Sequence, residues 1–322
     1  MGRRTNADGL GLNAMMAKSK GDSTTSDLFA DLLSPDQVAK KLKTFRPLSK
    51  PVWSDHKAKL IEKYLAFFVY ITKHGTYIDG FAGPQSPKHP ETWSAKRVLE
   101  SRPRFLRNFF LCDVDAERAK QLQTLWDTQP PREKNESKRQ CVVFHEDFNK
   151  CVDEILASGT ITEKEAAFAL LDQRTFECDW RTVEKLAQHK KTGNKIELFY
   201  FLAAKWLHRS MSGFKGDAAR AAAWWGSDQW RELAGLTQRA ICDRMVERIR
   251  ALNYAYVLPF PIMEKDNGTG GSTMYFMIHA SDHDEAPGLM WRAYKQAHSL
   301  GAPPTQGALE LSLVPNPPQM AN

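Results

Sequence analysis

Short apolar runs alternate with amphipathic segments through the middle of the chain, and this alternation restricts the fold more than any other feature. The five runs are residues 76–80, 108–115, 141–148, 166–173 and 195–202. Segments with helical spacing of apolar residues separate them, as in 115–127 and 149–159. Strands of a parallel sheet are covered on both faces, so they consist of continuous apolar residues. The pattern therefore predicts an α/β fold with a mostly parallel sheet.

The segments around these runs complete the expected domain. Residues 218–253 have helical spacing throughout. Two further apolar runs, 254–262 and 272–281, are joined by a short polar, Gly-rich connection. So short a connection can join only antiparallel strands, which predicts a C-terminal hairpin.

The two ends of the chain differ in composition from the middle. Residues 1–44 are rich in Gly, Ser, Asp, Lys and Thr, and residues 301–322 are rich in Pro. Few apolar groups are present in either to form a core. We therefore expect a mobile N-terminal arm over 1–44, one domain over 45–300, and a disordered tail over 301–322.

Composition restricts the cellular setting. No run of 18 apolar residues is present, so no membrane span is expected. The N-terminus has no apolar segment typical of a secretory signal. The five cysteines form no CxxC pair, which disfavours a disulfide framework or a zinc site, and no metal site is expected. These features favour a reducing cytoplasm.

Charge is unevenly distributed along the chain. Residues 45–110 contain 12 Lys and Arg against 5 Asp and Glu, and residues 181–250 contain 14 against 7. Residues 111–180 contain 9 against 15. Nucleic acid, RNA or DNA, is one partner that such basic segments fit. Basic helices that coat the outside of a domain are an equally good explanation.

Four of the five apolar runs carry an aspartate near their end: Asp79, Asp113, Asp147 and Asp172. The carboxyl ends of parallel strands form one edge of the sheet, where ligands bind. We expect Asp113 to accept hydrogen bonds from ribose hydroxyls and Asp147 to accept one from the exocyclic amine of a purine. Asp172 faces the expected place of reaction. The alternative is that these residues cap turns and helices.

A bend follows the first run in the sequence "YIDGFAGPQ". Gly80 and Gly83 let the backbone approach a ligand closely. No GxGxxG or GxxxxGK[ST] motif is present, and Asp113 follows Asp79 by 34 residues instead of about 20. Pro84 also removes one backbone N–H from the bend. The bend thus suits a cofactor without a pyrophosphate.

Together "YIDGFAGPQ", "FFLCDVD", "FALLDQRTFECDW", a WWG element and the hairpin resemble the three-Cys-motif partner protein family, TcmP, over residues 50–297. This resemblance implies a Rossmann-like class I methyltransferase fold, with a seven-stranded sheet whose last strand is antiparallel. It also implies a three-Cys-motif protein as partner and S-adenosylmethionine as cofactor. The implied cofactor-binding residues are Asp79, Gly80, Phe81, Ala82, Gly83 and Asp113.

Two departures from the family pattern concern the site. Gln85 stands where the family has glycine, and "DQRTF" keeps Asp172 and Phe176 but lacks the proline that usually follows the aspartate. By resemblance, Asp172 and Phe176 are the expected catalytic residues. The expected function is an S-adenosylmethionine-dependent methyltransferase that acts on or with nucleic acid. A catalytically inactive binding subunit of a larger complex is the first alternative, and an oxidoreductase is the second.

Overall fold

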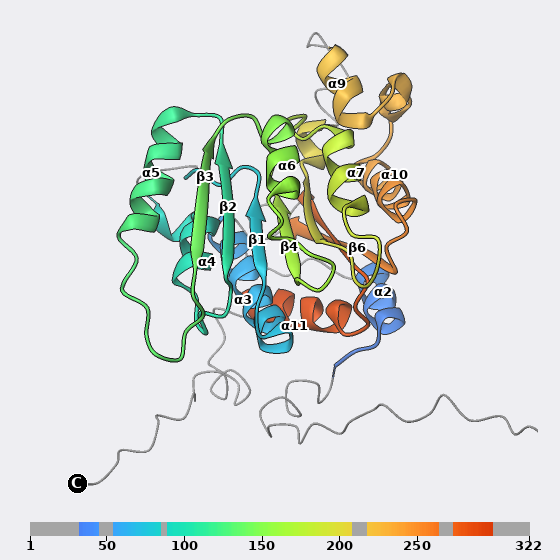
Figure 1. The fold of residues 1–322 in the computed structure, drawn as a ribbon. Coiled ribbons are helices and arrows are strands. Elements are labelled where there is room, and N and C mark those ends of the chain that lie inside the picture. Colours follow the sequence, from blue (N-terminus) through green and yellow to red (C-terminus); the bar gives the residue numbers. More distant parts are fainter. Residues whose placement is uncertain (1–31, 45–53, 85–88, 208–217, 264–272, 299–322) are drawn as a thin grey trace, which may run out of the picture. The chain divides into compact units, whose positions relative to one another are not determined.

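The computed structural model describes residues 32–44, 54–84, 89–207, 218–263 and 273–298. These residues form an α/β fold with a seven-stranded mixed sheet (Figure 1). The described helices and strands follow in this order: α2 Pro35–Thr44, α3 Ser54–Thr72, β1 Thr76–Asp79, η1 Pro90–Thr92, α4 Ser94–Glu100, β2 Asn108–Asp113, α5 Ala116–Asp127, β3 Gln140–His145, α6 Phe148–Ala157, β4 Ala167–Leu171, α7 Trp180–Gln188, β5 Glu197–Leu202, α9 Ala218–Trp225, η2 Asp228–Leu233, α10 Gln238–Arg250, β6 Tyr256–Met263, β7 Thr273–Ser281 and α11 Ala286–His298.

The strand order is β3-β2-β1-β4-β5-β7-β6. Strands β1 to β5 pair in parallel, whereas β7 is antiparallel to both of its neighbours, β5 and β6. The expected α/β class, the mostly parallel sheet and the antiparallel C-terminal hairpin are therefore confirmed. The order reverses between β1 and β4, and in open α/β sheets this reversal point is where ligands bind.

Helices cover both faces of the sheet, as the apolar runs required. On one face, Tyr64 of α3 packs against Phe199 of β5 with ring centroids 5.2 Å apart, and Tyr294 of α11 packs against Phe260 of β6 at 5.4 Å. On the other face, α6, α7 and α10 bury side chains against β1, β4 and β5 in one apolar cluster. Each fully buried large apolar side chain contributes about 1.5–3 kcal/mol. Packing on both faces thus fixes the sheet, including the carboxyl ends of the strands where ligands bind in such folds.

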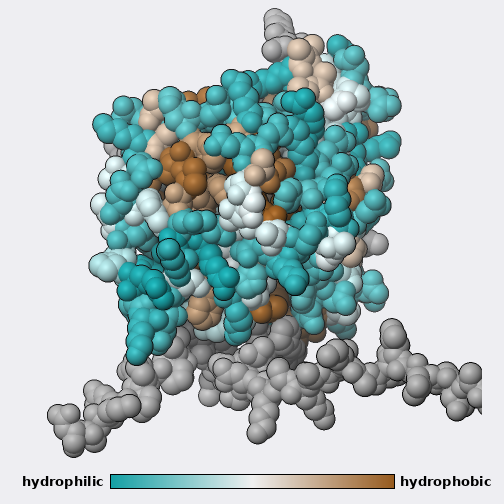
Figure 2. Space-filling model, viewed as in Figure 1, coloured by the Kyte–Doolittle hydropathy of each residue, from teal (hydrophilic) through white to brown (hydrophobic). Residues whose placement is uncertain are grey.

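Strand β3 is the exposed edge of the sheet. Its residues are exposed or half-buried, and Val142 is 43% exposed. Figure 2 shows apolar side chains at the surface on the side where β3 lies in Figure 1, within a mainly hydrophilic face. None of the described helices is long and apolar enough to cross a membrane.

The helical stretch expected over 218–253 is interrupted twice. Gly226 and Gly235 have φ of 79° and 80°, a left-handed conformation that glycine adopts at low energy. These two turns divide the stretch into α9, η2 and α10. Trp224 and Trp225 of the WWG element are buried in the core, as aromatic side chains at helical spacing usually are.

The structure also differs from the expected mobile arm over its last residues. Residues 35–44 form α2, which contacts α11 and β6, and Val38 is completely buried. The backbone oxygen of Leu33 lies 2.7 Å from the position a Cβ would take on Gly288. This packing, which composition did not reveal, places residues 32–44 within the ordered domain. Residues 1–31 and the tail 301–322 lie outside the described residues.

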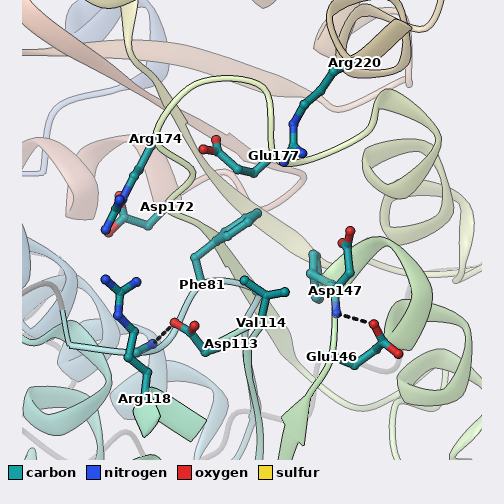
Figure 3. Close-up of a pocket in the computed structure, with 13 residues that line it drawn as sticks. Phe81, Asp113, Val114, Arg118, Glu146, Asp147, Asp172, Arg174, Glu177 and Arg220 are labelled. Carbon is teal, nitrogen blue, oxygen red and sulfur yellow. Dashed lines mark hydrogen bonds between the residues drawn. The ribbon is translucent and has the colours of Figure 1, made fainter. Parts of the chain in front are cut away.

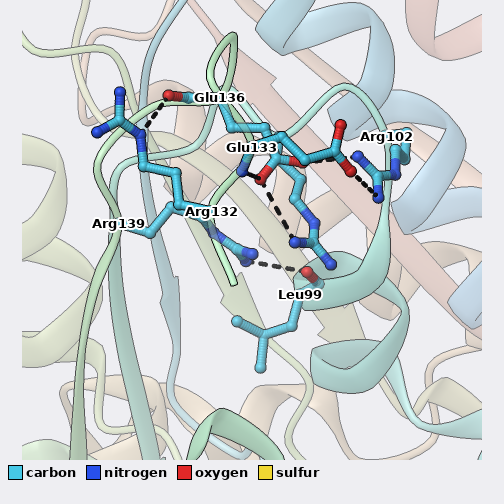
Figure 4. Close-up of polar contacts among 7 residues, drawn as sticks. Leu99, Arg102, Arg132, Glu133, Glu136 and Arg139 are labelled. Atoms are coloured by element: carbon cyan, nitrogen blue, oxygen red, sulfur yellow. Dashed lines mark hydrogen bonds and ion pairs between the residues drawn. The ribbon is translucent and has the colours of Figure 1, made fainter. Parts of the chain in front are cut away.

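An arginine–glutamate cluster fastens the loop between α5 and β3 (Figure 4). Glu136 accepts from Arg102 at 2.6 Å, from Arg104 at 3.5 Å and from the Glu133 amide at 3.0 Å. Burial alone raises the pKa of Glu136, but this amide and the two arginines outweigh burial and hold the pKa below its usual value. Arg139 donates to the Leu99 carbonyl at 2.9 Å. The cluster stabilises the scaffold and is separate from the site described below.

Candidate functional site

A cavity of about 290 Å³ lies at the carboxyl ends of β1 to β4 (Figure 3). Its volume is near the lower end of the range for small-molecule sites, roughly 300–1,000 Å³. The residues that line it are Gly80, Phe81, Gly83, Asp113, Val114, Arg118, Glu146, Asp147, Phe148, Asp172, Arg174, Glu177 and Arg220. The cavity therefore spans the point where the strand order reverses.

The bend after β1 is held against the end of β2. The Gly83 amide donates to Asp113 at 3.0 Å, and the Asp115 amide donates to the other Asp113 oxygen at 2.9 Å. A Cβ on Gly83 would lie 2.2 Å from the Asp113 carboxylate, so no other residue fits there. The Ala82 amide donates to the Cys112 carbonyl at 2.8 Å and fixes the middle of the bend. Asp113 and Gly83 line the cavity, whereas Ala82 does not.

Asp79 lies beneath the cavity instead of lining it, contrary to its expected contact with the cofactor. The sheet register explains this position, because Asp79 pairs with Leu111 and Leu170, two residues before Asp113 and Asp172. Its carboxylate accepts from the Tyr77 hydroxyl at 2.8 Å and from the Phe81 amide at 3.1 Å. Burial raises the pKa of Asp79 to about 7. Asp79 thus shapes the bend from within.

Gly80 and Phe81 form the β1 side of the cavity. A Cβ on Gly80 would lie 2.6 Å from the Phe148 ring, so glycine lets α6 pack directly on the bend. Phe81 is half-buried, and its ring lies in the centre of the cavity in Figure 3. The Phe81 and Phe148 ring centroids are 6.1 Å apart in an edge-to-face arrangement. These two rings give the cavity an apolar side.

Asp147 lines the cavity and also caps α6. Its carboxylate accepts from the Asn149 amide at 2.9 Å, so the capping interpretation of this residue is correct as a local description. The Asn149 side chain in turn donates to the Glu177 carbonyl at 2.7 Å and accepts from the Asp179 amide at 2.8 Å. Asn149 thereby fixes the loop after β4, a role that no sequence pattern indicated.

Asp172 lines the cavity and forms an ion pair that was not predicted from the sequence. The Lys57 ammonium of α3 donates to Asp172 at 2.5 Å, and both side chains are 12% exposed. Burial raises the pKa of Asp172, whereas Lys57 and Arg174 oppose the rise. The position of Lys57 in the sequence could have indicated that it is buried. It lies on the same helical face as Leu60, Ile61 and Tyr64, where an apolar residue is expected. A cation there requires a buried anion.

Phe176 does not lie in the cavity, contrary to its expected role beside Asp172. It belongs to the apolar core, where its ring lies 5.1 Å from that of Trp224 in an edge-to-face arrangement. Gln173, which stands where the family has proline, is buried and accepts from the Cys178 amide at 3.0 Å. Gln173 and Phe176 are both buried, so both side chains of this loop point away from solvent. Phe81 is the aromatic residue that the cavity contains instead.

The cavity carries charges of both signs. Five carboxylates and three guanidinium groups line it. Within the described part of the chain, no group of three or more His, Cys, Asp or Glu residues is arranged to hold a metal ion.

Comparison with protein-family models found no match, and no curated protein matches the sequence.

Proposed function

We propose that this chain binds S-adenosylmethionine in the cavity and transfers its methyl group to nucleic acid. The observation that carries the proposal is the position of the bend and of Asp113, which together form the cavity wall at the reversal point of the sheet. The single reversed strand, β7, agrees with the class I methyltransferase fold that the resemblance implies.

The residues that line the cavity fit this cofactor. Gly83 presents backbone without a Cβ, and that Cβ would collide with Asp113. Asp113 would hold the ribose, because its carboxylate lies at the end of β2. Val114 is 71% exposed at the cavity, so it offers an apolar surface to a flat base. The surrounding carboxylates favour the positive charges of the sulfonium and ammonium groups.

Bound cofactor supplies an electrophilic methyl group, and the chain's own residues supply orientation and proton acceptance. Asp172 is the acid best placed to contact the methyl acceptor, since it lines the cavity and follows β4, the strand that pairs with β1. As a carboxylate it can accept a hydrogen bond from an amino group and take up the proton that this group loses. Lys57 favours this ionised form.

One observation favours the alternative of a catalytically inactive binding subunit. Phe176 is buried in the core, so the aromatic group expected to stack on the acceptor base is absent from its expected place. A three-Cys-motif protein remains the proposed partner, and the resemblance alone supports it. A subunit without catalysis would bind the cofactor yet transfer no methyl group.

Titration calorimetry with S-adenosylmethionine tests the cofactor site. Gly83→Ala should displace the bend from Asp113, because the added Cβ would lie 2.2 Å from its carboxylate, and so weaken binding by about 10-fold or more. Asp113→Asn should also weaken binding without adding bulk. Gly235→Ala is the control, because its added Cβ has no atom within 4 Å and lies outside the cavity.

The outcomes separate the candidate functions. Binding together with incorporation of labelled methyl into RNA or DNA supports the proposal, and binding without incorporation supports the inactive subunit. Equal affinity of wild type and of both cavity variants would refute the assignment of the bend. Binding of a nicotinamide cofactor in place of S-adenosylmethionine would support the oxidoreductase.

A further inference from the structure

Each of the five carboxylates in the cavity already has a partner within the described residues. Asp172 pairs with Lys57 at 2.5 Å, and both oxygens of Asp113 accept from backbone amides. Glu146 pairs with Lys150 at 3.2 Å. Glu177 accepts from the Thr175 amide at 2.6 Å, and Asp147 accepts from Asn149 at 2.9 Å. These acids are thus engaged before any ligand binds.

The three arginines of the cavity are in the opposite situation. The side chains of Arg118, Arg174 and Arg220 make no hydrogen bond or ion pair with any residue that the structure describes, although acids surround them (Figure 3). Arg174 and Arg220 are exposed. Arginines elsewhere do find partners, for example Arg97 with Glu62 at 2.8 Å. The cavity therefore contains three guanidinium groups whose N–H donors have no hydrogen-bond partner among the described residues.

Two of these arginines are placed to receive a ligand that enters from solvent. Arg174 lies in the loop after β4, two residues from Asp172. Arg220 lies on α9, which is anchored because its Trp224 is completely buried and donates to the Tyr200 hydroxyl at 2.7 Å. Arg118 lies instead beside the bend that is proposed to hold the methyl donor, since its Cβ is 2.7 Å from the position that a Cβ would take on Gly83.

We infer that Arg174 and Arg220 bind a phosphate group of the acceptor strand at the mouth of the cavity. Guanidinium groups bind phosphate with short, charge-assisted hydrogen bonds. The acids then serve the cationic cofactor while the arginines bind the anionic acceptor, so one cavity accommodates ligands of opposite charge. The inference deepens the proposed function, because it assigns the acceptor to molecules with phosphodiester groups.

The test is fluorescence anisotropy of a labelled single-stranded DNA 12-mer across a KCl series, repeated with RNA of the same sequence. Each phosphate contact on a single strand adds about 0.7 to the slope of log K against log salt. The double variant Arg174→Gln/Arg220→Gln loses one phosphate contact, so it should lower the slope by about 0.7 and weaken binding about 5-fold at 0.1 M salt. Arg239→Gln/Arg244→Gln removes the same charge from exposed positions on α10, outside the cavity, and should change neither quantity by this amount.

Two kinds of result would overturn the inference. One is a lack of arginine-dependent binding: the wild type binds neither strand, or Arg174→Gln/Arg220→Gln binds as well as the control Arg239→Gln/Arg244→Gln. The other is displacement of the strand by polyglutamate as readily as by unlabelled strand, which would assign the arginines to an acidic polypeptide. Calorimetry with S-adenosylmethionine is run on the same variants. Loss of cofactor binding with retained arginine-dependent strand binding refutes the proposed function but not the phosphate site.

Discussion

Replacing Lys57 by methionine tests the ion pair that links α3 to the cavity. Methionine keeps the length and the apolar stem of the side chain but removes the charge, so Asp172 loses its partner. Both groups are only 12% exposed, which means that water replaces little of the lost interaction. The ammonium also lies 4.8 Å from the centre of the Phe201 ring, a cation–π contact that methionine cannot make.

The expected loss of stability follows from the burial of the pair. Removing one partner of a buried ion pair typically costs about 3–5 kcal/mol, because the other charge is left uncompensated. We expect a value near the lower end, about 3 kcal/mol, since Asp172 can become protonated and since Arg174 also favours its ionised form. For a chain of 322 residues this corresponds to a fall in Tm of about 4 °C.

The loss of stability in Lys57→Met should depend on pH, and the direction of this dependence follows from the number of protons bound by the native and unfolded states. Burial raises the pKa of Asp172, and removing Lys57 raises it further. The native variant then keeps a proton that the unfolded chain releases above about pH 4. A native state that binds more protons than the unfolded state loses stability as the pH rises. The loss of stability caused by the substitution should therefore be larger at pH 8 than at pH 5.

Urea unfolding at the two pH values measures this difference. Lys185→Met is the matched control, because its pair with Asp153 at 2.6 Å is exposed and is expected to contribute less than about 1 kcal/mol. The double variant Lys57→Met/Asp172→Asn should recover much of the lost stability. Equal losses at pH 5 and pH 8, together with additive effects in the double variant, would refute the reasoning.

Two further predictions concern the scaffold of the site. The stability of the wild type should fall between about pH 4 and pH 7, by up to roughly 4 kcal/mol, because the pKa of Asp79 is raised to about 7 in the native state. Asp79→Asn should flatten this part of a urea-unfolding pH series, and an unchanged slope would contradict the assignment. Gly226→Ala should destabilise the protein by about 1–3 kcal/mol more than Gly235→Ala, since both glycines have positive φ but only the first added Cβ, at 2.7 Å, meets Trp180. Equal thermal shifts for the two variants would show that this contact is unimportant.

The order of strands and helices was predictable wherever strands are buried on both faces. Residues 197–202 are buried at every position, and their sequence is apolar almost throughout. Residues 218–253 were less predictable, because apolar spacing continues through both positive-φ glycines. Glycine is tolerated within helices, so its presence alone does not locate a break. Helix α2 is short and polar on average, and only its contacts with α11 and β6 show that it belongs to the domain.

The candidate site was predictable in its location but not in its details. Parallel strands bring their carboxyl ends to one edge, which places Asp113, Asp147 and Asp172 at one cavity. Which acids face the cavity depends on register, however, and an offset of two residues buries Asp79. Lys57 is 115 residues from its partner, and no local pattern relates the two. Only the tertiary fold brings such groups together.

The position of β7 has a consequence for the order of events during synthesis. β7 lies between β5 and β6, although both of these strands precede it in the chain. Until residues 273–281 leave the ribosome, β5 has an open edge and β6 has no neighbour to pair with. A nascent chain that ends before β7 therefore exposes two adhesive backbone edges at once, which is the condition in which partly made proteins associate with each other. The last strand thus completes the sheet by joining β6 to β5. A stop codon shortly before residue 273 should therefore yield an insoluble chain instead of a smaller domain.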